Sequence, residues 1–187
     1  MARAVGGEFS PQQIARVIRD KALALTSEQT VASDAYWKDL IKKGLDANTI
    51  NRRVAKFNAR QLQDRAETIA LTEIHRAAQA GTIASWQAAA NQGLIDPSEW
   101  VKVWHVTWDD RLCPICEPMD GVAVGLFDNF TVNTDGKAID NGFEKSTEIA
   151  AAHPRCRCTI TRVRADQLDA WRERLNRPEE KPQSHRP

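Results

Sequence analysis

The sequence predicts an α+β protein: an N-terminal arm of long helices, then a small antiparallel β unit, then a C-terminal helix. Three observations predict this class. Apolar residues recur with the period of about 3.6 residues that is typical of helices, up to Gly93. The segment Trp100–Trp108 is rich in β-branched and aromatic residues, which indicates a strand. Four cysteines then lie in two short pairs that a long segment separates.

Composition and charge narrow the class further. The chain has 187 residues, of which 42% are hydrophobic, enough for one core with extensions. It lacks the run of about 18 apolar residues that a membrane span needs, and its first residues lack the apolar core of a signal peptide. Residues 1–63 hold 11 Lys and Arg against 6 Asp and Glu, whereas residues 64–187 hold 15 against 19. A basic arm could contact DNA or an acidic protein surface, although a solvated helix face explains the charge equally well.

Helix signals follow one another along the arm. Ser10 precedes a proline at a predicted helix start, and apolar residues keep the helical period to about Leu25. A second helix is expected to follow Thr26 and to end near Gly44, which suits a helix terminus. A third is expected to begin after Asp46 or Asn48.

The region from Asp64 onward has two interpretations. Asp64 and Glu67 match a capping box, so a new helix could begin there. Alternatively, both residues lie inside one long helix from about 48 to 92. In either case Gly93 is a natural C-cap, and Pro97 prevents the helix from resuming.

Three strands and a turn are predicted beyond the helices. The strand Trp100–Trp108 comes first, Gly121–Phe127 reads as a second short strand, and Cys158–Val163 as a third. The segment Asn133–Gly136 suggests a hairpin turn.

The predicted elements divide the chain into four parts. Residues 1–63 form a helical arm that folds alone or only when it docks to a partner. Residues 64–165 form the main domain, and residues 166–177 a last helix. Residues 178–187 contain mainly proline, charged and polar residues, so we expect them to be disordered.

The cysteine pairs are the candidate chemical centre. Cys113 and Cys116 form a Cys-x2-Cys unit, whose turn can direct both sulfurs toward one ion. His153, Cys156 and Cys158 supply three further donors. Closely spaced cysteines in a reducing compartment bind metal more often than they form disulfides, and structural zinc takes four nitrogen or sulfur ligands in a tetrahedron. The sequence therefore predicts a structural zinc knuckle.

Five candidates compete for four positions in this zinc site. Cys156 and Cys158 are two residues apart, so on a strand they would face opposite sides and one would not be a ligand. The preferred set is Cys113, Cys116, His153 and Cys156, with Cys158 in reserve. A four-cysteine site with His153 beside it is the next alternative. Buried free thiols and two disulfides are the alternatives without metal.

Three segments of the chain resemble signatures of the phage Mu F-like head-morphogenesis family. Trp104–Gly121 is similar to the first signature, His153–Thr159 to the second and Ala70–Ala78 to a third, in matching order and spacing. The likeness covers residues 50–163. It departs from the family at Ala151 and the next residue, where members often have prolines.

The resemblance implies a minor head (capsid) protein of a tailed phage or prophage. Such a protein would be structural and would act in head assembly and in DNA packaging or ejection, at the portal or in the capsid interior. The implied partners are the portal protein and the major capsid or scaffold protein, with double-stranded DNA as a further candidate and no membrane. The implied location is the virion, after synthesis in the host cytoplasm.

Further residues near the knuckle have candidate roles in DNA binding. Arg155, Arg157, Arg162 and Arg164 could contact DNA phosphates. A DNA-binding module is therefore one alternative function, and steep salt dependence of binding would favour it.

Polar residues around the knuckle are expected to be structural. Asp109 or Asp110 could cap the turn before the first cysteine pair or accept an N–H from a ligand histidine, and Arg111 could pair with either. Thr72, Glu73 and His75 are expected to pack and hydrogen-bond onto the knuckle domain rather than to act in acid–base chemistry.

No catalytic residue is predicted. A zinc enzyme leaves one metal position open to water and places a carboxylate base nearby. Here five donors crowd the site, so we expect a closed centre and no enzyme. A nuclease or toxin built on a zinc scaffold is the other alternative function, but it needs a catalytic pair of histidines, or of histidine and asparagine, that the motifs do not supply.

Overall fold

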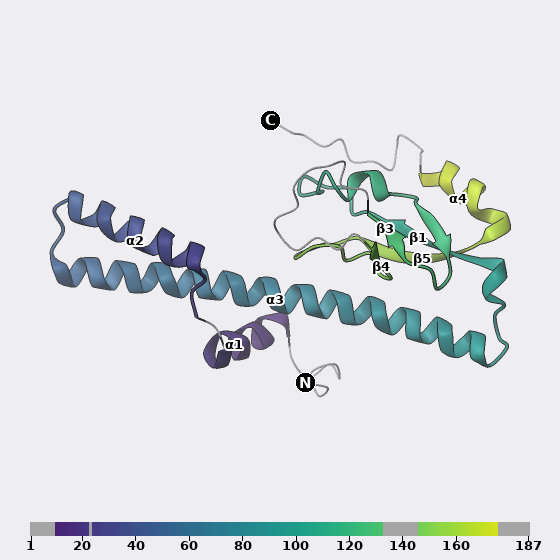
Figure 1. Cartoon of the computed structure of the whole chain (residues 1–187), viewed down its shortest axis with the longest axis horizontal. Helices are drawn as coiled ribbons and strands as arrows, with labels where there is room; N and C mark the ends of the chain where they lie inside the picture. The colour runs from purple at the N-terminus through teal and green to yellow at the C-terminus, as the bar shows by residue number, and fades with distance from the viewer. Residues whose placement is uncertain (1–9, 23, 133–145, 176–187) are drawn as a thin grey trace. The chain divides into compact units, whose positions relative to one another are not determined.

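The computed structural model describes residues 10–22, 24–132 and 146–175 (Figure 1). It confirms the α+β class, with long helices first and small antiparallel sheets and a last helix after them. Two compact units divide between Ile74 and His75, within helix α3. The boundary expected after residue 63 also falls inside this helix, so the separate folding of arm and domain stays a prediction.

The first two helices begin where local signals place them, and the first ends at Ala22 rather than near Leu25. They are α1 (Pro11–Ala22) and α2 (Ser27–Lys42). The Thr26 hydroxyl accepts the backbone N–H of Gln29 at 3.2 Å, and the Gln29 side chain accepts the N–H of Thr26 at 3.0 Å, which completes a capping box. The chain leaves α2 through Gly44, whose φ of 70° suits glycine.

Helix α3 runs without a break over Ala47–Asn91, so the interpretation as one long helix is correct. The Asp46 carboxylate accepts the backbone N–H of Thr49 at 2.9 Å and caps the helix start. Asp64 lies well inside the helix, where its carbonyl accepts the Thr68 hydroxyl at 2.8 Å. The capping-box pattern at this position therefore marks no helix start.

Small side chains let the helices of the first unit approach closely. Ala15 on α1 and Ala66 and Ala70 on α3 are almost fully buried against one another. Helix α2 packs on α3 through the rings of Tyr36 and Phe57, whose centroids lie 4.7 Å apart.

The main sheet of the second unit has three antiparallel strands in the order β2-β1-β5. They are β1 (Trp100–His105), β2 (Ala123–Gly125) and β5 (Thr159–Arg164). In the central pair, Trp104 on β1 lies opposite Ile160 on β5. The three predicted strands are thus present: β1 and β2 are shorter than predicted, and β5 is shifted by one residue.

The early end of β1 has a local cause. Strand β1 ends at His105 rather than at Trp108, because the next backbone N–H donates to the Asp120 carboxylate at 3.0 Å instead of to a strand. Strand β5 begins at Thr159, so Cys158 precedes it.

The remaining elements are short. A second sheet, which the sequence analysis did not predict, pairs β3 (Phe130–Thr131) with β4 (Ser146–Thr147). Helix α4 (Leu168–Leu175) is the predicted last helix. Short 3-10 helices precede β1, follow the first cysteine pair and precede α4, at Pro97–Glu99, Glu117–Met119 and Ala165–Gln167. The turn expected at 133–136 and the tail at 178–187 lie outside the described residues.

Helices pack on both faces of the main sheet. From the second half of α3, Ile83 joins Trp104 and Ile160 in the core of this unit. On the other face, the Trp171 ring of α4 lies 6.3 Å from the ring of His105. None of the helices that the structure describes combines the length and apolar character needed to cross a membrane.

Candidate metal centre

The first knuckle is a tight turn over Cys113 and Cys116. The N–H of Cys116 donates to the carbonyl of Cys113 at 3.0 Å, and the N–H of Glu117 donates to the same carbonyl at 2.9 Å. The N–H of Ile115 lies 3.4 Å from the Cys113 sulfur and donates to it. The turn thus directs a backbone N–H at the Cys113 sulfur.

The second knuckle is a matching turn that presents His153. The N–H of Cys156 donates to the His153 carbonyl at 3.1 Å, and Arg155 between them adopts a left-handed backbone with φ 58°. The imidazole Nδ1 lies 2.8 Å from the carbonyl oxygen of Pro154. Because that oxygen can only accept, Nδ1 carries the hydrogen and Nε2 has its lone pair available for a metal.

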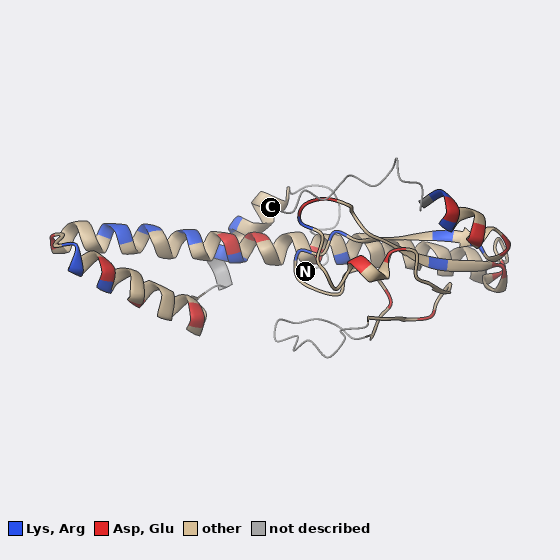
Figure 2. Cartoon of the chain, turned by 90° about the horizontal axis from the view of Figure 1, so that it is seen from above, with Lys and Arg blue, Asp and Glu red and all other residues tan. Residues whose placement is uncertain are grey.

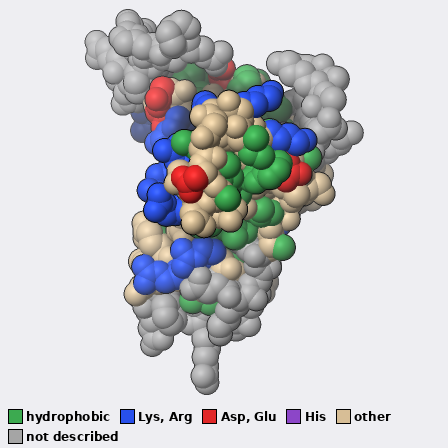
Figure 3. Space-filling view, turned by 90° about the vertical axis from the view of Figure 1, so that its left-hand side faces the viewer, with side chains coloured by type: hydrophobic (Ala, Val, Ile, Leu, Met, Phe, Trp, Pro, Cys, Tyr) green, Lys and Arg blue, Asp and Glu red, His purple; other side chains and the backbone are tan. Residues whose placement is uncertain are grey.

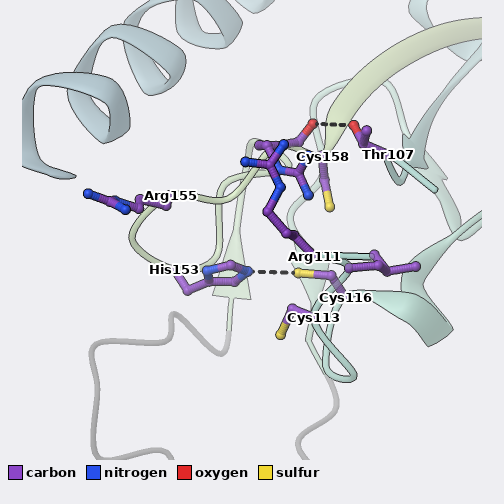
Figure 4. A pocket seen from close by; sticks show the side chains of 9 residues that line it. Thr107, Arg111, Cys113, Cys116, His153, Arg155 and Cys158 are labelled. Carbon is purple, nitrogen blue, oxygen red and sulfur yellow. Dashed lines mark hydrogen bonds between the residues drawn. The ribbon is translucent and has the colours of Figure 1, made fainter. Parts of the chain in front are cut away.

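The two turns meet at Cys116. Its sulfur lies 3.1 Å from Nε2 of His153 (Figure 4). The same sulfur lies 3.9 Å from the sulfur of Cys156. Ligand atoms of Cys113, Cys116 and His153 lie within 4.8 Å of one another, as do those of Cys116, Cys156 and Cys158. All five candidates from the sequence therefore form one cluster that could hold a metal ion.

The cluster dimensions fit zinc. Two sulfurs on a tetrahedral zinc, each about 2.3 Å from the ion, lie about 3.8 Å apart. The separation of 3.9 Å between Cys116 and Cys156 matches this geometry. Sulfur and imidazole donors are the set that structural zinc prefers. Which four of the five donors bind stays a prediction.

The expectation that Cys156 and Cys158 face opposite sides is wrong. It assumed a strand, but β5 begins only at Thr159. Both thiols are buried, and both approach Cys116. Cys158 is therefore as well placed as Cys156.

Mutual contacts separate the pKa values of the buried thiols. The contact with Cys156, followed by that with Cys158, raises the pKa of Cys116. Conversely, contacts with Cys116 and Cys158 lower the pKa of Cys156. The three sulfurs therefore share negative charge unevenly, and the thiolate is the form that binds metals.

Helix α3 holds the second knuckle through a residue that the sequence analysis missed. The buried side chain of Gln79 accepts the N–H of Ala150 at 2.9 Å and donates to the carbonyl of Cys158 at 3.0 Å. Nε2 of His75, one turn earlier, lies 2.7 Å from the same carbonyl. The signal that could have revealed Gln79 is a polar residue on the apolar stripe of the helix, four residues after a histidine.

The structure places two other predicted α3 residues differently. The Thr72 hydroxyl donates to the Thr68 carbonyl of its own helix at 2.6 Å, and Glu73 is exposed. Their packing against the knuckle domain stays a prediction.

An ion pair joins the segments beside the two knuckles. The Asp109 carboxylate accepts hydrogen bonds from both terminal nitrogens of Arg157, one of them at 2.6 Å. It also accepts the backbone N–H of Arg111 at 2.8 Å. The contact with Arg157 lowers the pKa of Asp109 to about 2. The Arg111 guanidinium lies farther away, 3.8 Å from Asp109 and 4.0 Å from Asp110.

Asp120 organises the other side of the first knuckle. Its carboxylate accepts the backbone N–H of Val106 at 3.0 Å and the indole N–H of Trp108 at 3.0 Å. Nδ1 of His105 lies 3.5 Å away, as an ion-pair contact. Burial alone would raise the pKa of Asp120, but these donors outweigh it and the pKa lies below its ordinary value.

The four arginines proposed to contact DNA have different surroundings. Arg157 is paired with Asp109. The Arg162 guanidinium carbon lies 4.4 Å from the ring centre of Trp100 and 5.9 Å from that of Trp86. Arg164 contacts carboxylates on neighbouring elements. Arg155 is exposed at the rim of a shallow hollow above the cluster (Figure 4).

These features define a class of protein: a helical hairpin, formed by α2 and the first half of α3, is joined to a small antiparallel sheet with a cysteine–histidine knuckle cluster at its end. The chain belongs to the phage Mu protein F-like family, whose sequence model matches residues 31–161. The match begins in α2, earlier than residue 50, so the hairpin is part of the shared region. The chain is therefore a phage head-related protein. No curated protein and no solved structure matches the chain.

Proposed function

We propose that the chain is a minor structural protein of a phage head, located at the portal or in the capsid interior, with a closed and non-catalytic metal centre. The observation that carries the proposal is the convergence of five nitrogen and sulfur donors, from two distant turns, in a domain of a head-related family. A role in head assembly and in DNA packaging or ejection is the finer part of the proposal.

The metal centre is proposed to be structural. Cys116 and Cys156, with two of the three other donors, would hold zinc, which would supply a cross-link between the two knuckles. Such a site contributes on the order of 10 kcal/mol of binding free energy, which becomes folding free energy. A unit with short strands and a small core gains much from that link. Deep burial of three thiols leaves little room for a substrate, which favours a closed centre.

The helical hairpin is proposed to dock to another head protein: portal, major capsid or scaffold. Three large apolar side chains are exposed on α2, at 44% for Trp37, 45% for Ile41 and 68% for Val31. Lysine and arginine residues recur along α2 and the first half of α3 (Figure 2), and basic side chains flank hydrophobic ones at the hairpin end (Figure 3). An apolar surface with an acidic rim would complement this face.

Contact with double-stranded DNA is a further part of the proposal. Arg155 is its best-placed candidate, because it is exposed whereas the other three arginines are partly buried.

Electron cryo-microscopy of the source particle tests the proposal. We expect density for this chain beside the portal or inside the shell. A chain that is absent from purified heads and present only in the cytosol of infected cells would overturn it.

A further inference from the structure

We propose that the indole N–H of Trp104 donates a hydrogen bond to the thiolate of Cys158 and that Cys158 is therefore one of the metal ligands. This inference rests on the metal centre proposed above and extends it. Cys158 would then be a ligand instead of a reserve candidate. Trp104, the most buried tryptophan of the sheet, would support the metal site.

Strand register brings the two side chains together. Trp104 on β1 lies directly opposite Ile160 on β5. Cys158 lies two residues before Ile160, so it continues the same face just beyond the strand end. A diagonal neighbour of this kind lies within reach of a large aromatic side chain. Both residues belong to one buried core cluster, with Trp104 0% and Cys158 3% exposed.

The indole N–H of Trp104 is a buried hydrogen-bond donor that lacks a well-formed acceptor among the described residues. Its nitrogen is fully buried and has no well-formed hydrogen bond among the residues that the structure describes. A buried N–H without an acceptor costs about as much free energy as a lost hydrogen bond. The Cys158 sulfur is the acceptor that this N–H approaches within the shared buried cluster. A neutral thiol is a weak acceptor, whereas a thiolate is a strong one.

Burial and ring packing hold the Trp104 side chain in this position. Its edge packs against Phe130, with ring centres 5.2 Å apart and an interplanar angle of 87°. Its backbone N–H donates to Val122 at 2.9 Å, and its carbonyl accepts the N–H of Gly121 at 2.9 Å. The donor is therefore preorganised for a negative charge on sulfur.

Cys158 is therefore held at two groups, its backbone carbonyl and its sulfur. Gln79 fixes its carbonyl oxygen from α3, at 3.0 Å, and Trp104 fixes its sulfur from β1. Such support is typical of a metal ligand rather than of a bystander thiol. With Cys116 and Cys156 nearby, one position then remains for Cys113 or His153.

Trp104→Phe tests the hydrogen bond, because it removes the N–H and keeps an aromatic ring. We expect zinc affinity, measured by competition with a chromophoric chelator, to fall about tenfold. A smaller side chain also lowers affinity through stability, so the decisive readout is the sulfur-to-metal charge-transfer band of the cobalt-loaded protein. Loss of an N–H donor to the thiolate should move this band to lower energy. The matched control is Trp108→Phe, because the Trp108 indole donates to Asp120 and not to a sulfur. The charge-transfer band of this variant should not move.

Cys158→Ser completes the test. We expect a cobalt spectrum with one sulfur ligand fewer and, in this background, no further band shift from Trp104→Phe. A wild-type cobalt spectrum in Cys158→Ser, or an unmoved band in Trp104→Phe, would overturn this inference while the metal centre stands. A wild-type chain that binds no metal would overturn both.

Discussion

The side-chain amide of Gln79 on α3 lies 3.0 Å from the carbonyl oxygen of Cys158 and donates to it. The same side chain accepts the N–H of Ala150 at 2.9 Å, just before the second knuckle begins. A rigid helix therefore fixes the chain on both sides of His153 and Cys156. The knuckle is positioned by hydrogen bonds from outside its own loop, in addition to any metal.

Replacement of Gln79 should destabilise the second unit. Gln79→Leu would leave the buried Ala150 N–H without its acceptor and would remove one of the two side chains that contact the Cys158 carbonyl, at a cost of roughly 1–3 kcal/mol. Denaturant unfolding of the metal-loaded chain measures this cost. Gln87→Leu, at an exposed position of the same helix, should change stability by less than about 0.5 kcal/mol. Equal effects of the two changes would refute the role of Gln79.

The pair of His105 and Asp120 should make stability depend on pH in a defined direction. The contact with Asp120 raises the pKa of His105 above 6.5. The charged pair therefore stabilises the fold fully below pH 6.5, and this contribution is lost as the pH rises through the raised folded pKa. A His105→Gln variant should lose stability relative to wild type at pH 6 and below, by an amount that shrinks toward pH 9. A difference that is constant over that range would contradict this account.

The left-handed backbone at Arg155 predicts an unusual order of stabilities. Its φ of 58° disfavours a side chain with Cβ by about 1 kcal/mol relative to glycine. Arg155→Gly and Arg155→Ala remove the same side-chain contacts, so their difference isolates the backbone. We expect the glycine variant to be the more stable by about 1 kcal/mol in thermal unfolding. A more stable alanine variant would show that the turn relaxes to a right-handed form.

If the hairpin docks to another head protein, changes on its exposed face should reduce incorporation of the chain into particles without impairing its folding. Simultaneous Trp37→Ala and Ile41→Ala changes affect exposed side chains, so stability should change by less than about 1 kcal/mol. The copies of the chain in purified heads, counted by quantitative mass spectrometry, should fall severalfold. Leu94→Ala, another exposed apolar side chain, is the control and should leave the number unchanged. Full incorporation of the double variant would exclude this face as the docking site.

The parts that local signals determine could be predicted from the sequence. The helical period and the caps at Thr26 and Asp46 gave the first helices, and the spacing of the cysteines gave the cluster. The strand at Trp100 followed from its β-branched and aromatic residues. Each of these signals lies within a few residues of the structure that it predicts.

The parts that depend on distant partners could not be predicted. Gln79 became a knuckle support only because α3 passes Ala150 and Cys158, both more than seventy residues away. The short pair β3–β4 contains two residues per strand, too few for a periodic signal. The strand end at His105 depends on the Asp120 carboxylate, which captures the next N–H across the first knuckle.

The metal content of the purified chain tests the central claim most directly. Elemental analysis of protein prepared under reducing conditions, without added metal or chelator, should give about one zinc per chain. A folded chain with no bound metal would contradict the account, because five donors would then surround no ion and the knuckles would hold together by packing and hydrogen bonds alone.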